Sequence, residues 1–351
     1  MSQELRIAIV APLWASVPPV TYGGIERHLY LLIEELTQRG HSVTLFATGD
    51  SRTSALLRSV VASGVADRMD RGEAYFYEHY QNTNLAEALK ASDAYDVLHL
   101  HLGCAAIPLA ELAHCPVIHT IHTGITPDDL WILERFPETP LTALTGRQLA
   151  DVPPERRKPI TVVPYGFNFN ICVASDRPSG HLAFLGRMAP HKAPDAAIQI
   201  ARAAGWQIRL AGLPVTTEDQ VWFHREIEPL IDGREVVWLG AVDDAGKDEL
   251  FRGAAALLFP IRWEEPFGLV MLEALARGVP VLATPRGSVP EVVESEVTGF
   301  VADDLGELAG HVEAAAGLDR VTVRERAKRR FSVTRMVDAY EDVYARMRNC
   351  G

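Results

Sequence analysis

The chain has 351 residues, of which 48% are hydrophobic and 8% aromatic, and its formal net charge is -12. This length accommodates two domains of ordinary size, and the apolar content is typical of a globular protein with well-filled cores. Both halves of the chain are acidic, which argues against a nucleic-acid partner and against strong attraction to anionic lipid.

The N-terminus lacks the patterns of a membrane span and of a signal peptide. Its apolar run, ELRIAIVAPLW, is too short to cross a bilayer and is not followed by a cleavage series. The four cysteines are scattered without a CxxC pair, so neither a zinc knuckle nor a disulfide framework is indicated. We expect a cytoplasmic protein without a membrane span, and leave peripheral association and oligomeric state open.

Strands and helices alternate along the first half of the chain. A loop at 12–24 precedes apolar residues at helical spacing over 25–36, and Gly40 ends that helix. Strand, helix, strand in this order predicts a parallel sheet with helices on both faces. The expected strands are 6–11, 42–47 and the runs that follow Asp96 and Pro116.

The second half repeats this alternation after a proline-rich, charged interval at 151–159. We place the domain boundary near Ile171, and a last helical pattern covers 333–347. The fold class is therefore α/β, with two doubly wound parallel-sheet domains. The expected strands are 183–185, 207–211, 236–239 and 256–260, and the expected helices are one ending at Ala204, 220–230 and 247–253.

The segment WEEPFGLVMLEALARG sets Glu265 and Glu273 at either end of a turn that runs into a helix. Pro266 stands where a helix tolerates proline best, and the amides of 267–269 would then be free for an anion. Eight residues of helix rise about 12 Å, comparable to a sugar joined through a diphosphate to a ribose. An amphipathic helix with two solvated acids is the alternative interpretation.

This segment resembles the retaining glycosyltransferases of family 4, which have the GT-B fold. Glu265 and Glu273 match the family motif of two glutamates separated by seven residues, and the similarity continues through GVPV at 278–281 and TGF at 298–300. The resemblance implies that Glu265 contacts the hydroxyls of the donor sugar and Glu273 those of the ribose. It also implies that sugar and phosphate face the backbone amides of Phe267, Gly268 and Leu269.

The resemblance covers nearly the whole chain and implies two Rossmann-like domains that face a central cleft. Residues 1–171 would form the acceptor-binding domain and residues 172–331 the domain that binds a nucleotide-sugar donor. The helix at about 332–351 would pack back on the first domain. The hinge segment ITVVPYGFN departs from the family pattern at Tyr165 and Asn168, so neither residue is assigned a catalytic role.

Glycines are expected to admit ligands at two loops. Gly23 and Gly24 precede the first helix, where absent side chains would let a phosphate or an acceptor approach its N-terminus, although a tight turn explains such a pair equally well. Their context, TYGGIERHLYLL, resembles the glycine loop of the family. Gly240, in VVWLGAV, resembles the loop whose backbone meets the nucleobase.

Two cations follow the strand HLAFLG, at Arg187 and Lys192. Preorganised cations in a cleft poor in water would stabilise a leaving nucleoside diphosphate, and surface exposure is the alternative. The spacing GRMAPHK resembles the Gly-Arg, short loop, Lys-Gly segment of the family. The glycine expected after the lysine is Ala193, which puts the loop shape in question.

Four histidines stand at strand ends, in DVLHLH and VIHTIHT. Alternate residues of a strand share a face, so His99 and His101 could meet, but no cysteine or acidic pattern completes a metal site. His122 resembles the family histidine that faces the donor sugar. For His99 and His119 we expect partly buried side chains with their hydrogen bonds satisfied.

The sequence therefore predicts a retaining glycosyltransferase that moves a sugar from a nucleotide-diphosphate sugar to a small-molecule, glycan or natural-product acceptor. The expected catalytic residues are Arg187, Lys192, His122 and Glu265. No Asp-x-Asp motif is present, so neither a metal nor a cofactor is expected. A GT-B epimerase or phosphorylase and a nucleotide-sugar-binding protein without turnover are the alternatives.

Overall fold

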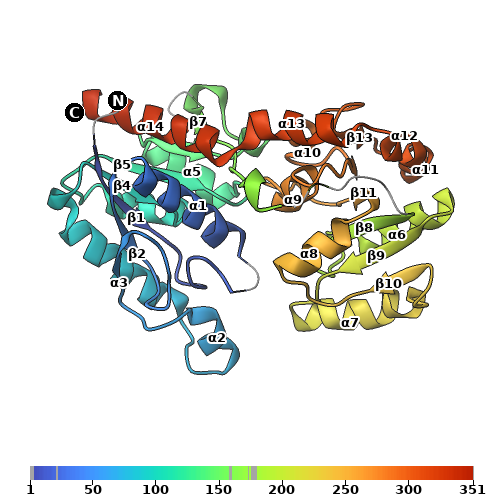
Figure 1. Cartoon of the computed structure of the whole chain (residues 1–351). Coiled ribbons are helices and arrows are strands. Elements are labelled where there is room, and N and C mark those ends of the chain that lie inside the picture. The colour runs from blue at the N-terminus through green and yellow to red at the C-terminus, as the bar shows by residue number, and fades with distance from the viewer. Residues whose placement is uncertain (1–3, 21–22, 158–159, 173, 175–179, 351) are drawn as a thin grey trace. The chain divides into compact units, whose positions relative to one another are not determined.

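The computed structural model describes residues 4–20, 23–157, 160–172, 174 and 180–350. The chain divides into two compact units (Figure 1). Unit 1 comprises Met1–Gly166 and Val333–Gly351, and unit 2 comprises Phe167–Ser332. The division thus falls five residues before the boundary expected after Ile171, and the last helix belongs to the same unit as the N-terminal half.

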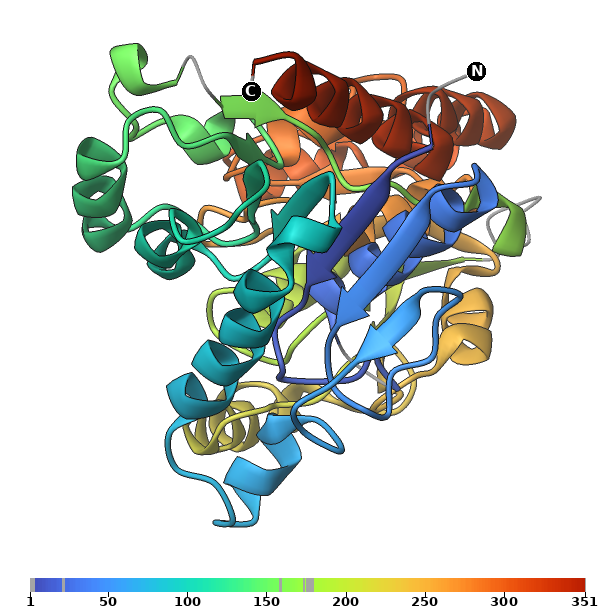
Figure 2. The same cartoon turned by 90° about the vertical axis from the view of Figure 1, so that its left-hand side faces the viewer.

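Unit 1 contains a parallel sheet of seven strands within the described residues, in the order β3-β2-β1-β4-β5-β6-β7. The central strands are almost entirely apolar because helices cover both faces of a parallel sheet. In Figure 2 the blue strands β1 and β2 run side by side through this unit. The strands are β1 (Arg6–Val10), β2 (Ser42–Phe46), β3 (Leu56–Arg58), β4 (Val97–Leu100), β5 (Val117–Ile121), β6 (Leu141–Ala143) and β7 (Ile160–Val162).

The longest helices of unit 1 pack through apolar stripes. In the first helix Leu29, Leu32, Ile33 and Leu36 are fully buried, as the spacing predicted. The α-helices are α1 (Gly24–Gln38), α2 (Val65–Asp70), α3 (Tyr77–Lys90), α4 (Ile107–Ala110), α5 (Pro127–Arg135) and α14 (Val333–Cys350). Short 3-10 helices occur at Ser92–Ala94, Cys104–Ala106, Arg147–Leu149 and Pro154–Arg156.

Helix α14 belongs to the core of unit 1 although it lies at the other end of the sequence. Val337, Tyr340 and Tyr344 are fully buried in the cluster that also contains the strand residues Ile7 and Ile9. Burying a large aromatic side chain stabilises a fold by about 1.5–3 kcal/mol. The helix is therefore an integral element of this unit.

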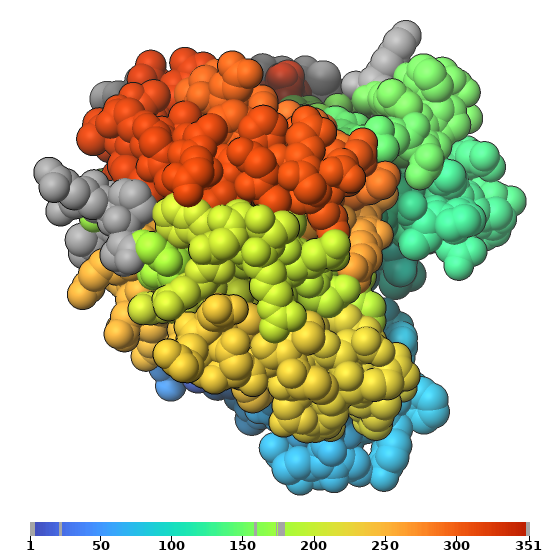
Figure 3. Space-filling view, turned by 90° about the vertical axis from the view of Figure 1, so that its right-hand side faces the viewer, coloured from blue at the N-terminus to red at the C-terminus, as the bar shows by residue number. Residues whose placement is uncertain are grey.

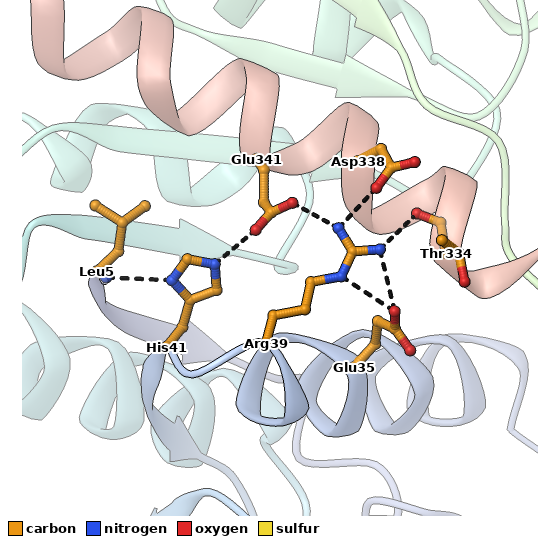
Figure 4. Close-up of polar contacts among 7 residues, drawn as sticks. All are labelled: Leu5, Glu35, Arg39, His41, Thr334, Asp338 and Glu341. Atoms are coloured by element: carbon orange, nitrogen blue, oxygen red, sulfur yellow. Dashed lines mark hydrogen bonds and ion pairs between the residues drawn. The ribbon is translucent and has the colours of Figure 1, made fainter. Parts of the chain in front are cut away.

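A polar cluster joins α14 to the end of α1 (Figure 4). The Arg39 guanidinium donates to Glu35 (3.1 Å), to Asp338 (2.7 Å), to Glu341 (2.6 Å) and to the carbonyl of Thr334 (3.0 Å). Beside it, the backbone N–H of Leu5 donates to Nδ1 of His41 at 3.1 Å, so Nε2 of that ring carries the proton given to Glu341 at 2.8 Å.

Unit 2 contains a parallel sheet of six strands within the described residues, in the order β10-β9-β8-β11-β12-β13. The strands are β8 (His181–Leu185), β9 (Gln207–Ala211), β10 (Val236–Trp238), β11 (Ala254–Phe259), β12 (Val281–Ala283) and β13 (Gly299–Val301). The helices are α6 (Pro194–Ala204), α7 (Thr217–Glu226), α8 (Asp244–Phe251), α9 (Leu269–Leu275), α10 (Val289–Val292), α11 (Leu305–Gly310), α12 (Val312–Ala316) and α13 (Arg320–Phe331), with 3-10 helices at Phe169–Ile171 and Glu228–Leu230. Figure 3 shows the yellow-green surface of α6 against the orange-red surface of α11.

The sheet order fixes where each unit presents its functional loops. In unit 2 the strand order reverses between β8 and β11, and in unit 1 it reverses between β1 and β4. Ligands of open parallel sheets bind beyond the carboxyl ends of the strands at such a point. The loops that follow β8 and β11 therefore meet at the expected binding edge of unit 2.

Candidate functional site

Glu265 and Lys192 come from the loops after β11 and β8, and their side chains form an ion pair. Both are largely buried, with Glu265 at 9% exposure. The indole N–H of Trp263 donates to the same carboxylate oxygen, Oε2, at 3.1 Å. The Lys192 ammonium also lies over the Trp263 ring, 4.5 Å from its centroid. The structure thus brings these two expected site residues into direct contact.

The backbone of Glu265 is hydrogen-bonded to the loop after β12. The N–H of Ser288 donates to the Glu265 carbonyl at 2.8 Å, and Ser288 Oγ donates to the carbonyl of Phe267 at 2.6 Å. Gly287 has a φ of +53°, and a Cβ there would stand 2.2 Å from the Glu265 carbonyl oxygen. Only glycine permits this close approach of two backbones.

The helix after this turn begins later than the sequence predicts. Helix α9 starts at Leu269, after Gly268 in the left-handed region at φ +77°, so Pro266 precedes the helix and does not occupy its first turn. The Phe267 side chain is buried and packs edge-on against Phe331. The expectation of a helix N-terminus formed by Pro266 was therefore wrong, because a glycine with positive φ separates the proline from the helix.

Glu273 lies on α9 and pairs with Lys247 of α8 at 2.6 Å. Glu273 is 9% exposed as a residue, and the Lys247 side chain is similarly buried. The backbone carbonyl of Glu273 accepts a hydrogen bond from Arg277 at 2.8 Å, and that arginine pairs with Asp248. The second acid of the motif is thus held by an α8 lysine that the sequence did not indicate.

Arg187 is held by the start of α7. Asp219 forms a capping box with Thr216 and accepts a hydrogen bond from Arg187 Nε. Burial acts to raise the pKa of the Asp219 carboxyl, but hydrogen bonds from Arg187 and from the N–H groups of Thr216 and Val215 lower it below its ordinary value. This carboxylate therefore fixes the guanidinium beside the carboxyl end of β8.

Two backbone features complete the unit 2 site. Ala193, which replaces the expected glycine, has φ +56° and ψ +51°, the left-handed conformation that glycine adopts most easily. The loop shape is thus one that glycine would also adopt. Gly240 has φ +70°, its carbonyl accepts from Gly212 N–H at 2.7 Å, and the space beside its Cα is open.

The remaining expected residues, Gly23, Gly24 and His122, lie in unit 1. Gly23 precedes α1 and Gly24 is its first residue. A Cβ at Gly23 would stand 2.6 Å from the Glu26 carboxylate, a buried group whose pKa burial raises. The Gly23 position therefore makes room for an acidic side chain in the first turn of α1.

His122 is enclosed by other side chains of unit 1. Its Nε2 lies 2.8 Å from Nδ1 of His101, and its Nδ1 lies 2.6 Å from the hydroxyl of Tyr165. Burial lowers the pKa of His122 to about 3, so the ring is neutral at neutral pH. Tyr165, which replaces an asparagine of the family pattern, thus orients this histidine.

For His99 and His119 the expected partial burial is wrong, since both are fully buried, and the expected hydrogen bonding is confirmed for His99 alone. His99 is bonded to Tyr344 (2.8 Å) and to Thr120 (2.7 Å). Within the described residues, neither ring nitrogen of His119 has a hydrogen-bond partner, and both side chains are fully buried. His119 is thus buried without a hydrogen bond among the described residues, which the alternation pattern cannot reveal.

Two family models match the chain. The model described as Glycosyltransferase Family 4 matches residues 22–168, and the model described as Glycosyl transferases group 1 matches residues 175–318. Together they span most of the sequence. This protein belongs to glycosyltransferase family 4.

Relatives and solved structures agree with this assignment. The D-inositol 3-phosphate glycosyltransferase of Mycolicibacterium smegmatis is 26% identical over 92% of this chain and 86% of its own length. The crystal structure of AviGT4, a glycosyltransferase involved in avilamycin A biosynthesis, is 26% identical with a TM-score of 0.71 over 99% of both chains. Sucrose-phosphate synthase from Thermosynechococcus elongatus, at 19% identity, shares the fold with a TM-score of 0.77 over 99% of this chain and 100% of its own. This glycosyltransferase therefore has the GT-B fold.

Three residues of the family 4 enzyme's unit 2 site escaped the sequence analysis. Asp219 had a signal, because the TTED segment has the spacing of a capping box. Trp263 and Lys247 had none, since the Lys247 partner Glu273 comes from another helix and the two-residue separation of Trp263 from Glu265 does not reveal their hydrogen bond. As for membranes, the described helices include none that is both long and apolar enough to span a bilayer.

Proposed function

We propose that this glycosyltransferase takes its sugar from a nucleotide-diphosphate donor, binds that donor in unit 2, and transfers the sugar with retention of anomeric configuration. The pairing of Glu265 with Lys192 and of Glu273 with Lys247 carries the proposal. Each acid of the motif is held beside a cation, which suits a ligand that alternates hydroxyls and phosphates. The family resemblance supports the same use of these residues.

The residues have distinct roles in this proposal. Glu265 accepts hydrogen bonds from sugar hydroxyls, and Glu273 accepts those of the ribose. Lys192 and Arg187 stabilise the negative charge that develops on the leaving diphosphate as the glycosidic bond breaks. A diphosphate oxygen takes the proton of the acceptor hydroxyl on the face where the new bond forms, so the configuration is retained. No metal or cofactor takes part in this scheme.

The acceptor is proposed to bind unit 1, at the loops of residues 14–22 and 64–80, of which 21 and 22 lie outside the described residues. Trp14 stacks on Tyr77 at 3.8 Å between ring centroids and is itself half-exposed. Tyr75 and Phe76 are also exposed. Aromatic faces of this kind suit the apolar face of a sugar or another planar acceptor. His122 and the Gly23–Gly24 loop are proposed to contact substrate from the same unit.

A nucleotide-sugar screen tests the donor assignment. UDP-, GDP-, ADP- and dTDP-sugars are added to the protein, and the true donor raises its melting temperature because it binds the folded state. Products are then sought with D-inositol 3-phosphate among the acceptors, since a relative is named for it. NMR of the product reads the anomeric configuration, and inversion would contradict the proposal.

Two variants separate the roles of the motif residues. Glu273→Ala should abolish donor binding, whereas Lys192→Ala should weaken it by no more than about tenfold and chiefly lower turnover, by about a hundredfold or more. Glu249→Ala, which removes an exposed acid from α8, is the matched control and should change neither. Normal donor affinity in Glu273→Ala would contradict the ribose assignment.

A further inference from the structure

Trp263 makes three different contacts in the unit 2 site. Its indole N–H donates to Glu265 Oε2 at 3.1 Å, and its ring lies beneath the Lys192 ammonium at 4.5 Å. The ring of His191 meets it edge-on, with centroids 5.3 Å apart and an interplanar angle of 74°. One side chain thus touches both the acid and the cation of the ion pair.

Hydrogen bonds join the segment that carries Trp263 to the loop that carries His191. The backbone N–H of Arg262 donates to the carbonyl of His191 at 2.9 Å. Its guanidinium donates to the Pro190 carbonyl at 3.2 Å and to both oxygens of Asp195 at 2.9 and 2.6 Å. The loop that carries Lys192 and the segment that carries Trp263 and Glu265 therefore hold one another in register.

The two oxygens of Glu265 differ in their surroundings. Oε2 accepts from Lys192 and from Trp263, whereas Oε1 has no hydrogen-bond partner among the described residues. Two donors on one oxygen fix the plane and direction of a carboxylate. The other oxygen is then presented in a defined direction with its acceptor capacity unused.

We propose that Trp263 is a positioning residue that sets how tightly and how selectively the donor sugar is bound, by holding Glu265 Oε2 so that Oε1 meets a sugar hydroxyl. This inference rests on the proposed function, in which Glu265 receives the sugar and Lys192 the diphosphate. A bound diphosphate competes with Glu265 for the lysine. The indole N–H then remains as the donor that keeps the carboxylate oriented.

The N–H and the ring of Trp263 have separable effects. The N–H acts on Glu265 and hence on the sugar. The ring attracts the Lys192 ammonium through its quadrupole and keeps the cation at the site, which affects the diphosphate. A phenylalanine at this position keeps a ring and removes the N–H, and a leucine removes both.

The test compares Trp263→Phe and Trp263→Leu with the wild type by calorimetry. The probes are UDP, GDP, ADP and dTDP and their glucose, galactose and mannose derivatives. Trp263→Phe should bind the nucleoside diphosphate within about twofold of wild type but lose about tenfold in affinity for the nucleotide sugar. The differences in affinity among the glucose, galactose and mannose derivatives should also become smaller in this variant. Trp263→Leu should also weaken nucleoside diphosphate binding, by about fivefold.

Trp206→Phe is the matched control, because it removes an indole hydrogen bond to a carboxylate, that of Glu313 at 2.9 Å, elsewhere in unit 2. It should leave all affinities unchanged. Unaltered sugar affinity and preference in Trp263→Phe would overturn the inference, as would equal losses for the diphosphate and the nucleotide sugar, which indicate general damage to the site. A wild type that binds none of the nucleotide sugars would instead overturn the proposed function, and the inference with it.

Discussion

Two charged clusters of this molecule are built alike but differ in how completely they are paired. In unit 1 every N–H of the Arg39 guanidinium is engaged, by three carboxylates and a carbonyl. In unit 2 one oxygen of Glu265 is held by two donors, and the other has no partner among the described residues. Complete pairing joins helices, whereas incomplete pairing beyond a strand end leaves an acceptor for a ligand.

The interiors near the two sites differ as well. Besides His41 in the α14 cluster, unit 1 buries five more of the described histidines, at positions 28, 99, 101, 119 and 122, whose rings contact one another or lie on neighbouring strands. Burial lowers the pKa of each of these five. Unit 2 places paired acids and cations at its binding edge instead. The first arrangement predicts sensitivity to acid, and the second is consistent with the proposed charged donor.

The largest expected effect is the loss of unit 1 stability in mild acid. Unfolded histidines titrate near pH 6.5, whereas the pKa of His119 and of His122 in the folded chain is about 3. The stabilisation is complete above about pH 6.5 and is lost as the pH falls toward 3, because only the unfolded chain binds protons in that window. At pH 5, His119 and His122 should each lower the free energy of unfolding by about 2 kcal/mol. The buried histidines at positions 28, 99 and 101 act in the same direction.

Hydrogen exchange at pH 7 and pH 5, corrected for intrinsic rates, reads this effect separately for peptides of each unit. Protection should fall more in unit 1 than in unit 2, where burial lowers the pKa of only two described histidines, His181 and His191. His119→Leu should reduce by one the number of protons taken up on unfolding, and so weaken the pH dependence of stability. His114→Leu, at an exposed position, is the control. Equal loss of protection in both units would break the comparison.

The next largest expected effect concerns the close approach of Gly287 to the backbone of Glu265. Gly287→Ala places a Cβ 2.2 Å from the Glu265 carbonyl oxygen and should cost about 4 kcal/mol while abolishing donor binding. Gly233→Ala is the matched control, since Gly233 also has a positive φ, +72°, but nothing lies within 4 Å of its Cβ position. It should cost about 1–2 kcal/mol and leave donor binding intact. Chemical denaturation and calorimetry measure both, and equal behaviour of the two variants would contradict the close-approach argument.

The sequence predicted the alternating architecture because buried parallel strands and amphipathic helices have distinct periods. The helix of Leu29 and Leu36 that Gly40 follows is one example. It misplaced three helix starts for local reasons, among them that of α8, which begins at Asp244, not 247, because the Asp243 side chain caps it. Helix α7 begins at Thr217, not 220, because Thr216 and Asp219 form a capping box, and α9 begins at Leu269 because Gly268 takes a positive φ.

Side-chain partners between distant loops were largely beyond the sequence. Glu265 and Glu273 could be singled out from their spacing, but the lysines that hold them come from the α8 segment and from the loop after β8. Nothing local distinguishes Lys247 from a solvated lysine. Similarly, Ala193 shows that a loop can adopt the left-handed conformation without the glycine that would have indicated it. Such features depend on which strand ends become neighbours in the sheet.

The smallest expected effect concerns the fully paired cluster of unit 1. Arg39→Ala leaves Glu341 and Glu35 without their guanidinium and should destabilise unit 1 by about 2 kcal/mol, with faster hydrogen exchange in α14 and donor affinity unchanged. Arg71→Ala is the matched control, because that arginine also makes two 3.0 Å bonds to one acid, Glu73, but both side chains are more than half exposed. Its removal should leave the free energy of unfolding unchanged, because solvent screens an exposed ion pair. If the two variants lost equal stability, burial and completeness of pairing would not be what separates structural ion pairs from surface ones here.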